Sequence, residues 1–445
     1  MSVADRIKCV ENFVKMMVGY RSHVVKLLMW EIGKSLADSE KEFDRTVEYI
    51  YATIDELKKL DRDSSRFRID QGIIGQIRRS PLGIVLCMGP FNYPLNETYT
   101  MLIPALIMGN VVMFKPPRQG ILLHEIFQDA YQKCFPKGSI NFLYGRGSVV
   151  VPPLMTSGKV DCLTLIGSSK MADRLQKSHP KVNRLRSVLG LDAKNAAIIL
   201  KNADLDATVK EVVLGSLSFN GQRCTALKII HVHRSVAYAF INKLNDAIAA
   251  LQLGMPWDKG VQITPVAEPE KPTYLAEVIE DAVSKGAKIV NTEGGTSSGS
   301  FVFPTVLYPV SEGMTIYTEE QFGPIIPIVP FDDLEEPIQY LIKSNHGQQV
   351  SLFGTDSDQI AHLIDHLVNQ VSRVNVNAQC QRGPDSFPFT GRKDSAQGTL
   401  SVFDALRSFS IRTIVATKET PTSKALFNDI IEHNASNFLS TRYIF

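Results

Sequence analysis

Residues 83–115 read GIVLCMGPFNYPLNETYTMLIPALIMGNVVMFK, and this stretch decides the fold class. A short apolar run from Gly83 to Met88 predicts a buried strand, and the longer run from Tyr99 to Met108 predicts a helix. A further apolar run, Asn110 to Lys115, predicts a second strand. Strand, helix and strand joined by short connections are typical of a parallel sheet covered by helices. We therefore expect an α/β protein.

The same alternation continues along the chain in two series, one on each side of residue 203. In the first series we expect strands at 140–144, 161–166 and 195–200 and helices at 122–135 and 168–179. The second opens with a helix from about 204 to 218; its strands are expected at 229–232, 288–290, 325–329, 351–353 and 373–377, and its helices at 237–251, 274–285, 334–343 and 359–370. Two series predict two domains with a ligand cleft between them.

The first 62 residues and two later segments follow other patterns. Apolar residues recur at helical spacing through residues 1–62, which predicts two long helices. Residues 66–79 alternate between apolar and polar side chains and predict an exposed strand pair that needs a partner. Residues 409–418 alternate in the same way, whereas residues 419–445 show no pattern that places them.

Composition narrows the classes of function. The 445 residues carry a formal net charge of +2, and they contain no basic block interleaved with aromatic residues, so nucleic acid is not an expected partner. The six cysteines form no CxxC pair. That distribution argues against a zinc site or a disulfide framework and favours a reduced, cytoplasmic protein.

Neither a membrane nor a metal is expected. The most apolar run, Tyr99 to Phe114, is interrupted by Pro104 and falls short of the roughly 20 residues that a membrane helix needs. Charged residues break up the first 20 residues, so we expect no secretory signal. His362 and His366 have the spacing of a metal-binding pair, but the glutamate of an HExxH motif is missing, and a polar helix face explains them.

The stretch SFNGQRCT, Ser218–Thr225, places Cys224 next to Arg223 at the end of a helical run. A thiolate is a strong nucleophile, and a neighbouring guanidinium lowers the pKa of a thiol, so a reactive cysteine is one interpretation. Gly221 breaks the helix and lets the backbone present the sulfur to a cavity. The alternative is that Cys224 is a small core residue, as most free cysteines are.

Other motifs lie at strand ends, where α/β sheets bind ligands. Gly167–Ser168 opens a helix and offers backbone amides to a phosphate, although any strand-to-helix turn needs a glycine. Asn92, fixed between two prolines, either donates to a developing oxyanion or caps the next helix. Lys115 ends another strand. Glu319–Pro324 joins acids to an aromatic ring and contacts a ligand, unless it is only a solvated turn.

Taken in order, these motifs resemble the aldehyde dehydrogenase superfamily. The resemblance is carried by GPFNYP (89–94), FKPP (114–117), IGSS (166–169), FNGQRCT (219–225) and EEQFGP (319–324), and it runs from about Thr46 to Lys418. The FKPP-x-QG form and the segment QRGPDSFPF (381–389) are similar to one branch, the non-phosphorylating glyceraldehyde-3-phosphate dehydrogenases.

The resemblance implies roles for individual residues. Cys224 matches the nucleophile that attacks the aldehyde, and Asn92, together with the backbone amide of Cys224, matches the oxyanion hole. Cofactor contacts are implied at Phe91, Lys115, Arg118, Gly167, Ser168, Glu320 and Phe322. Tyr93, Arg223 and Arg382 match a clamp for the substrate phosphate, which agrees with the fork-like bonds that guanidinium groups make to phosphates.

The resemblance also implies a domain organisation. We expect a Rossmann-type cofactor-binding domain at residues 1–65 and 80–203 and an α/β catalytic domain at residues 204–405. Residues 66–79 and 406–418 then form a small β oligomerisation flap, and residues 419–445 form a tail. Alternating strands without a buried partner predict a homodimer or homotetramer.

One departure from the family concerns catalysis, because Gly190 stands where the family has its general-base glutamate. Asp192 lies two residues further along and, on an extended segment, faces the same side, so it is one candidate substitute. A second possibility is that the thioester passes to coenzyme A. A third is that unassisted water hydrolyses it slowly, since general base catalysis contributes about 10²–10⁴-fold.

A second departure concerns the cofactor. Pro117 and Arg118 stand where NAD-preferring members have a glutamate after the Lys-Pro pair, so Lys115 and Arg118 can bind a 2′-phosphate and NADP is expected over NAD. The leading prediction is an oxidoreductase that converts a small phosphorylated aldehyde, glyceraldehyde-3-phosphate first, to its acid through a cysteine thiohemiacetal and thioester. The alternatives are a CoA-acylating aldehyde dehydrogenase and a cofactor-binding protein that has lost turnover.

Overall fold

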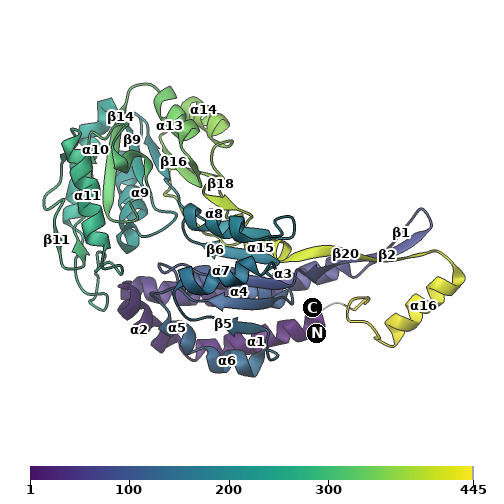
Figure 1. The fold of residues 1–445 in the computed structure, drawn as a ribbon. Helices are drawn as coiled ribbons and strands as arrows, with labels where there is room; N and C mark the ends of the chain where they lie inside the picture. The colour runs from purple at the N-terminus through teal and green to yellow at the C-terminus, as the bar shows by residue number, and fades with distance from the viewer. Residues whose placement is uncertain (443–445) are drawn as a thin grey trace.

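The strand–helix–strand unit predicted at residues 83–115 is present. In the computed structural model, which describes residues 1–442, it forms β3 (Ile84–Met88), α4 (Asn96–Ile107) and β4 (Val111–Lys115) (Figure 1). β3 pairs in parallel with β4 on one side and with β6 (Cys162–Ile166) on the other. The α/β fold class is confirmed.

This unit is the centre of a six-stranded sheet in the order β19-β7-β6-β3-β4-β5. β5 (Ile140–Phe142) and β7 (Arg186–Gly190) complete the parallel part, and β19 (Ala396–Gln397) adds an antiparallel edge. Val85 and Cys87 of β3 belong to the core on the α4 face, whereas Leu86 packs on the other face under α7 (Gly147–Thr156) and α8 (Ser169–Ser178). Each face of the sheet therefore buries a core of its own.

The N-terminal segment forms three helices, so the prediction of two was wrong. They are α1 (Val3–Val18), α2 (Arg21–Ile32) and α3 (Leu36–Ser64). The missed break follows α2, where Gly33 takes a φ of 67° and Ser35 begins α3 by accepting a hydrogen bond from the Asp38 amide at 3.2 Å. Together with α4 and α15 (Val402–Ser408), these helices cover one face of the six-stranded sheet.

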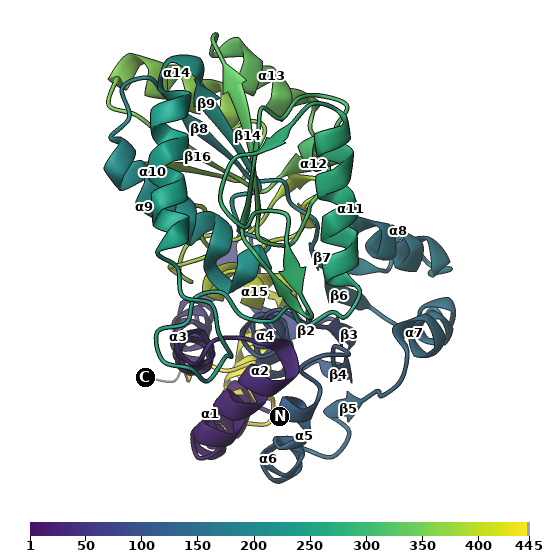
Figure 2. The same cartoon turned by 90° about the vertical axis from the view of Figure 1, so that its left-hand side faces the viewer.

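The second body is a seven-stranded sheet in the order β10-β13-β14-β9-β8-β16-β17, parallel except for β10. Figure 2 shows this sheet between α10 and α11, above the first body. Its strands are β8 (Ala196–Ile199), β9 (Ile229–His233), β10 (Lys288–Ile289), β13 (Thr305–Tyr308), β14 (Ile325–Phe331), β16 (Gln349–Phe353) and β17 (Arg373–Val376). Its helices are α9 (Leu205–Leu217), α10 (Ala237–Ala249), α11 (Lys271–Ser284), α13 (Glu335–Lys343) and α14 (Ser357–Leu367).

Two placements differ from the expected domain boundaries. β8 precedes residue 203 but pairs with β9 and β16 of the second sheet, because its four buried residues complete that core. In the other direction, β19 precedes residue 405 and α15 begins before it, but both lie on the first body. The chain therefore crosses between the bodies before residue 196 and returns near residue 396.

Several shorter elements were missed or merged in the sequence analysis. The helix expected at 122–135 is split into α5 (Leu122–Glu125) and α6 (Gln128–Cys134), and α7 was missed because it contains Pro152 and Pro153. The strands β7 and β13 were missed too. The remaining short elements are η1 (Ser218–Gly221), η2 (Arg234–Val236), β11 (Ser297–Ser298), β12 (Phe301–Val302), α12 (Thr315–Thr318), β15 (His346–Gly347) and β18 (Arg392–Lys393).

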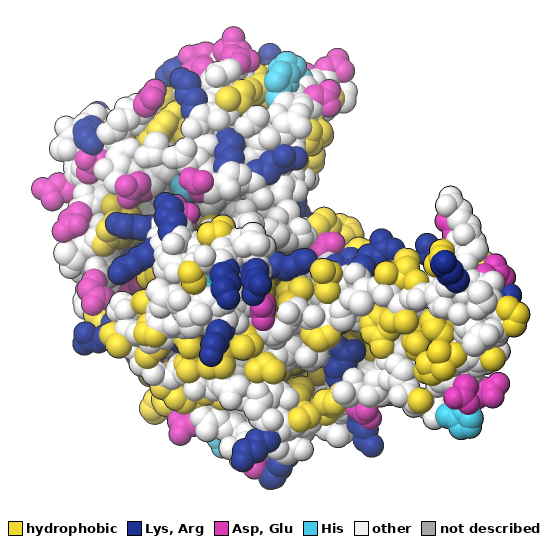
Figure 3. Space-filling model, turned by 45° about the vertical axis from the view of Figure 1, so that its right-hand side comes forward, with side chains coloured by type: hydrophobic (Ala, Val, Ile, Leu, Met, Phe, Trp, Pro, Cys, Tyr) yellow, Lys and Arg dark blue, Asp and Glu magenta, His cyan; other side chains and the backbone are white. Residues whose placement is uncertain are grey.

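The predicted flap is an antiparallel sheet in the order β1-β2-β20 that projects from the first body (Figure 1). It consists of β1 (Phe67–Asp70), β2 (Ile73–Pro81) and β20 (Ser410–Lys418). Apolar side chains are exposed along this arm, as Figure 3 shows. Ile69 and Ile414 each expose more than half of their surface.

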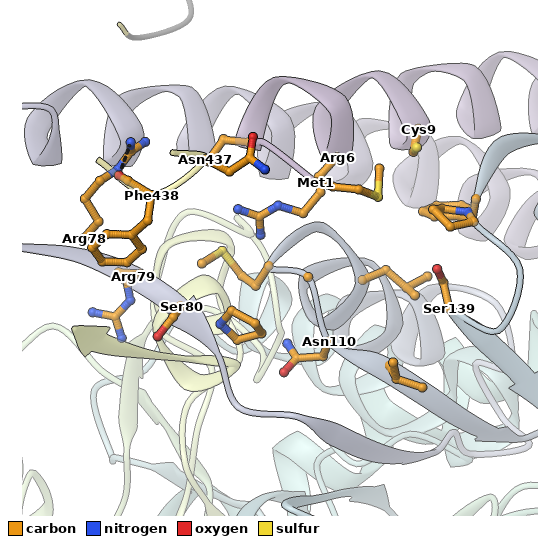
Figure 4. Close-up of a pocket in the computed structure, with 18 residues that line it drawn as sticks. Met1, Arg6, Cys9, Arg78, Arg79, Ser80, Asn110, Ser139, Asn437 and Phe438 are labelled. Carbon is orange, nitrogen blue, oxygen red and sulfur yellow. Dashed lines mark hydrogen bonds between the residues drawn. The ribbon is translucent and has the colours of Figure 1, made fainter. Parts of the chain in front are cut away.

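The tail, which the sequence did not place, forms α16 (Pro421–Glu432) and then returns to the flap. Arg78 of β2 donates to the Phe438 carbonyl at 2.9 Å, and the side chain of Gln76 accepts from the Ser440 amide at 3.1 Å. Figure 4 shows the cavity of about 310 Å³ that this return encloses with Arg6 and Asn110. Within residues 1–442, no helix has both the length and the hydropathy needed to cross a membrane.

Candidate active site

The loop that carries Cys224 is a tight turn at the end of α9. Phe219, Asn220 and Gly221 have φ values of 49°, 55° and 69°, so three consecutive residues take the left-handed conformation. A Cβ on Gly221 would lie 2.7 Å from the carbonyl oxygens of Ser216 and Gly323, which only glycine avoids. The Asn220 side chain fixes the turn by exchanging hydrogen bonds with the backbone of Thr264 at 2.8 and 3.0 Å.

Buried polar side chains hold the cysteine itself. The Cys224 carbonyl accepts hydrogen bonds from Asn195 Nδ2 and Lys228 Nζ, both at 2.8 Å. The side-chain amide of Asn92 donates to the carbonyl of Gln222 at 2.7 Å. The side chain predicted for the oxyanion hole therefore contacts the cysteine loop. The structure thus brings Asn92 against the loop of Cys224 from the other body, although Asn92 is not among the residues that line the Cys224 cavity.

The prediction that Arg223 lowers the pKa of the thiol was wrong. Burial raises the pKa of Cys224 to about 11, and the negative charge of Glu97 raises it further. Arg223 instead turns toward the end of α9, where it donates to the Gly215 carbonyl at 2.8 Å and to Gln379 at 3.3 Å. Arg223 is adjacent to Cys224 in sequence, but it is not among the charges that act most strongly on the Cys224 sulfur.

Cys224 lines a cavity of about 340 Å³ together with all three residues predicted to hold the substrate, Tyr93, Arg223 and Arg382. Arg382 is buried, forms an ion pair with Glu97 and stacks on the Phe389 ring at 4.5 Å. Its Nη2 group is buried and has no hydrogen-bond partner among residues 1–442. Cationic groups around a small cavity suit an anionic substrate.

A buried ion pair, which the sequence analysis missed, supports the wall of this cavity. Lys34 and Glu42 are fully buried, and they pair with each other. Lys34 also donates to the Asn92 carbonyl at 2.7 Å and lies 3.4 Å above the Tyr93 ring, while Glu42 accepts from the amides of Leu95 and Asn96 at 3.0 and 3.1 Å. No local pattern signals this pair, because its partners meet through tertiary packing.

A second cavity, of about 500 Å³, lies at the end of β4 and fits an anionic cofactor group. Lys115 and Arg118 line it as predicted, and Arg146, which the sequence analysis missed, adds a third cation. No carboxylate lines this cavity within the described residues. The set of donors therefore fits a phosphate, such as the 2′-phosphate that distinguishes NADP from NAD.

Gly167 and Ser168 lie at the start of α8, as predicted. The side chain of Asp192 lies against the same end of this helix. The Asp192 carboxylate accepts from the amide and the hydroxyl of Ser169, both at 2.7 Å. This carboxylate is bound at the start of α8 and is not among the residues that line the Cys224 cavity, which argues against the hypothesis that Asp192 replaces the missing base. A pyrophosphate at Ser168 would have to share this helix end with Asp192.

Three other predicted cofactor contacts gather beside the cysteine loop. Phe91 and Phe322 meet edge to face with ring centroids 6.0 Å apart. Glu320 pairs with Lys228 at 2.7 Å, and Lys228 also holds the Cys224 carbonyl. Lys228, which the sequence analysis did not single out, therefore connects the expected nicotinamide side of the site to the nucleophile.

His362 and His366 pack ring to ring on α14, 4.4 Å apart. Among residues 1–442 no three His, Cys, Asp or Glu side chains form a group that could hold a metal ion.

A cysteine on a tight turn, a side-chain amide against its loop and a cavity that contains two arginines are the arrangement expected of a thiol-dependent dehydrogenase. The sequence profile of the aldehyde dehydrogenase family matches residues 1–415, and the chain belongs to that family.

Two relatives and one solved structure make the similarity more specific. The chain is 32% identical over 426 residues to the NADP-dependent glyceraldehyde-3-phosphate dehydrogenase of Streptococcus equinus, covering 94% of this chain and 87% of the relative. It is 27% identical over 401 residues to the 3-sulfolactaldehyde dehydrogenase of Priestia aryabhattai, covering 88% and 82%. The crystal structure of NADP-dependent glyceraldehyde-3-phosphate dehydrogenase from Bacillus halodurans, complexed with NADP, superposes with a TM-score of 0.88 at 31% identity, covering 94% and 88%.

Removing one partner of the buried pair should destabilise the protein. Lys34→Met leaves the Glu42 carboxylate buried without a counter-charge, and we expect the free energy of unfolding to fall by about 3–5 kcal/mol. Urea unfolding followed by circular dichroism measures this loss. The double variant Lys34→Met/Glu42→Gln removes both charges and is expected to recover part of it. A loss below about 1 kcal/mol in the single variant would contradict the role given to the pair.

The reactivity of Cys224 should rise steeply with pH. Because burial raises the pKa of this thiol to about 11, only about one molecule in 10⁴ carries the thiolate at pH 7 in the absence of ligands. We expect the rate of alkylation by iodoacetamide to increase about tenfold per pH unit between pH 7 and 10. Peptide mass spectrometry separates Cys224 from the other cysteines, with Cys224→Ser as control. A plateau below pH 9 would show a thiol more acidic than this environment allows.

Proposed function

We propose that the protein oxidises a small phosphorylated aldehyde, glyceraldehyde-3-phosphate first, to its acid with NADP. The observation that carries this proposal is the single cavity in which Cys224 meets Tyr93, Arg223 and Arg382. The sequence similarity to NADP-dependent glyceraldehyde-3-phosphate dehydrogenases supports the same substrate. A cytoplasmic location remains a prediction.

In this proposal the cofactor site is assembled from both bodies. Lys115, Arg118 and Arg146 hold the 2′-phosphate, and Gly167 and Ser168 lie next to the pyrophosphate. Glu320 bonds the nicotinamide ribose, and Phe91 and Phe322 border the ring. When bound, NADP supplies the acceptor for the hydride.

The chain's own residues bind and orient the aldehyde. Arg382 and Arg223 attract its phosphate, and Tyr93 closes the cavity beside them. The Cys224 sulfur attacks the aldehyde carbon, and the oxyanion that develops is stabilised by the Asn92 side chain and the Cys224 backbone amide. Lys228 donates to the carbonyl of Cys224 and so holds the peptide that follows the nucleophile. Loss of hydride leaves a thioester on Cys224, which an acceptor must then release.

Sulfonated aldehydes form a second candidate class. A sulfonate presents three oxygens to the same guanidinium groups, and 3-sulfolactaldehyde dehydrogenase is among the relatives of this chain. The clamp itself therefore selects an anionic group, and the rest of the cavity must distinguish a phosphate from a sulfonate.

Turnover can be tested with purified protein, glyceraldehyde-3-phosphate and NADP, without inorganic phosphate or coenzyme A. We expect steady formation of reduced cofactor, a higher kcat/KM with NADP than with NAD, and no activity in Cys224→Ser. Arg118→Glu places a carboxylate in the cation-lined cavity and should reverse the cofactor preference.

Parallel assays with 3-sulfolactaldehyde rank the two aldehyde classes. A single burst that resumes only when coenzyme A is added would favour a CoA-acylating enzyme instead. No reduced cofactor with either aldehyde would overturn the proposed function.

We also propose that the flap joins copies of this chain into a homodimer or homotetramer. β20 is nine residues long and pairs only with β2 among the described strands, so its outer edge can accept another strand. The exposed Ile69, Ile414 and Leu426 supply apolar surface on the same arm.

Ile414→Asp places a charge on this surface and should shift the protein toward a monomer in sedimentation velocity. Asp206→Asn, which changes a charge on the exposed side of the second body, is the control. A monomeric wild-type protein at micromolar concentration would contradict the proposed assembly.

A further inference from the structure

The chemistry at Cys224 needs a proton acceptor. The thiol is protonated near neutral pH in this environment, so its proton must leave as the sulfur attacks the aldehyde. Water that later hydrolyses the thioester must also lose a proton. Gly190 offers no side chain for either task, and Asp192 is bound to Ser169 at the start of α8.

Three carboxylates line the Cys224 cavity, Asp38, Glu42 and Glu97. Both oxygens of Glu42 are occupied, one by Lys34 and the other by the amides of Leu95 and Asn96. Asp38 accepts a bond from the Ser35 hydroxyl at 3.1 Å in the first turn of α3. Of these three carboxylates, Glu97 is the one whose charge acts on the Cys224 thiol, which makes it the candidate.

Glu97 has the geometry that this task requires. It is the second residue of α4, directly after the Asn92 loop, and its side chain is 8% exposed. One oxygen, Oε2, pairs with Arg382, which fixes the carboxylate in the cavity wall. The other oxygen, Oε1, accepts no hydrogen bond from a residue within 1–442 and is free to receive a proton. Glu97 also contributes the largest electrostatic effect on the Cys224 thiol.

We propose that Glu97 is the proton acceptor for both half-reactions at Cys224, an inference that rests on the proposed function. In the first, the S–H proton passes to Oε1 as the sulfur–carbon bond forms, and Glu97 then releases it to solvent. In the second, water attacks the thioester carbon and gives one proton to Oε1. The carbon–sulfur bond breaks, the acid leaves, and the proton returns from Glu97 to the thiolate.

The pairing with Arg382 couples this carboxylate to substrate binding. Arg382 holds Glu97 through Nη1, while its buried Nη2 has no partner among the described residues. Removing the negative charge of Glu97 leaves the guanidinium more positive toward an incoming anion. The same substitution should therefore slow the chemistry without weakening the binding of a phosphorylated aldehyde.

The test is the isosteric variant Glu97→Gln, assayed with glyceraldehyde-3-phosphate and NADP. We expect kcat to fall by about 10²–10⁴-fold, KM for the aldehyde to stay equal or decrease, and the acidic limb of the kcat–pH profile to disappear. Rapid-quench measurement of the thioester separates its formation from its hydrolysis. Glu97→Asp keeps a carboxylate and should retain more activity than Glu97→Gln.

Asp61→Asn is the matched control, because Asp61 is also a buried carboxylate paired with an arginine, Arg78, and lies outside the cavity. If Glu97→Gln and Asp61→Asn lose stability and activity to the same extent, the role of Glu97 is structural and the inference fails. Unchanged kcat in Glu97→Gln would overturn it as well. A wild-type protein that forms no thioester would instead overturn the proposed function, so the two failures are distinguishable.

Discussion

The geometry of the cavity depends on the ion pair between Lys34 and Glu42. Lys34 lies between α2 and α3 and Glu42 lies in α3, yet the pair bonds three backbone groups between β3 and the start of α4, namely the Asn92 carbonyl and the amides of Leu95 and Asn96. Any shift of that loop would break hydrogen bonds to this buried pair, and buried charges are costly when their hydrogen bonds are incomplete. Asn92, the proposed oxyanion donor, lies on this loop and Glu97 lies in the first turn of the helix that follows, so one buried pair positions both.

The fold could be predicted largely from local pattern. Short apolar runs such as Gly83–Met88 mark strands that are buried on both faces, and their alternation with helices specifies a parallel sheet. What local pattern could not give was the assignment of strands to sheets. β8 follows β7 in sequence but joins β9 and β16, because sheet order is decided by tertiary pairing. Two adjacent prolines concealed α7 in the same way, since propensity alone argues against a helix there.

The site was predictable where its residues stand in ordered motifs and not where they meet across the fold. Cys224, Tyr93, Arg223 and Arg382 do line one cavity. Glu97 was overlooked because a single acid at the start of an apolar helix resembles an ordinary first-turn residue. The effect expected of Arg223 failed for the same physical reason, because side-chain direction, rather than adjacency in sequence, decides which charge the sulfur senses. A linear pattern identifies the residue types of a site more reliably than their electrostatic partners.

The way the tail is held on the flap has a consequence for how this chain can diverge. Arg78 and Gln76 bond the main chain of Phe438 and Ser440, not their side chains. The hydrogen bonds from the flap therefore depend on the backbone path of the tail and not on the identity of the side chains at Phe438 and Ser440. Within residues 436–440 the buried Leu439 and Ser436, whose hydroxyl accepts from the amides of Phe438 and Leu439, are constrained, so drift is tolerable at the other positions, whereas Gln76 and Arg78 have no such freedom. Among descendants of this chain, the receiving strand should keep its identity while the segment it receives changes.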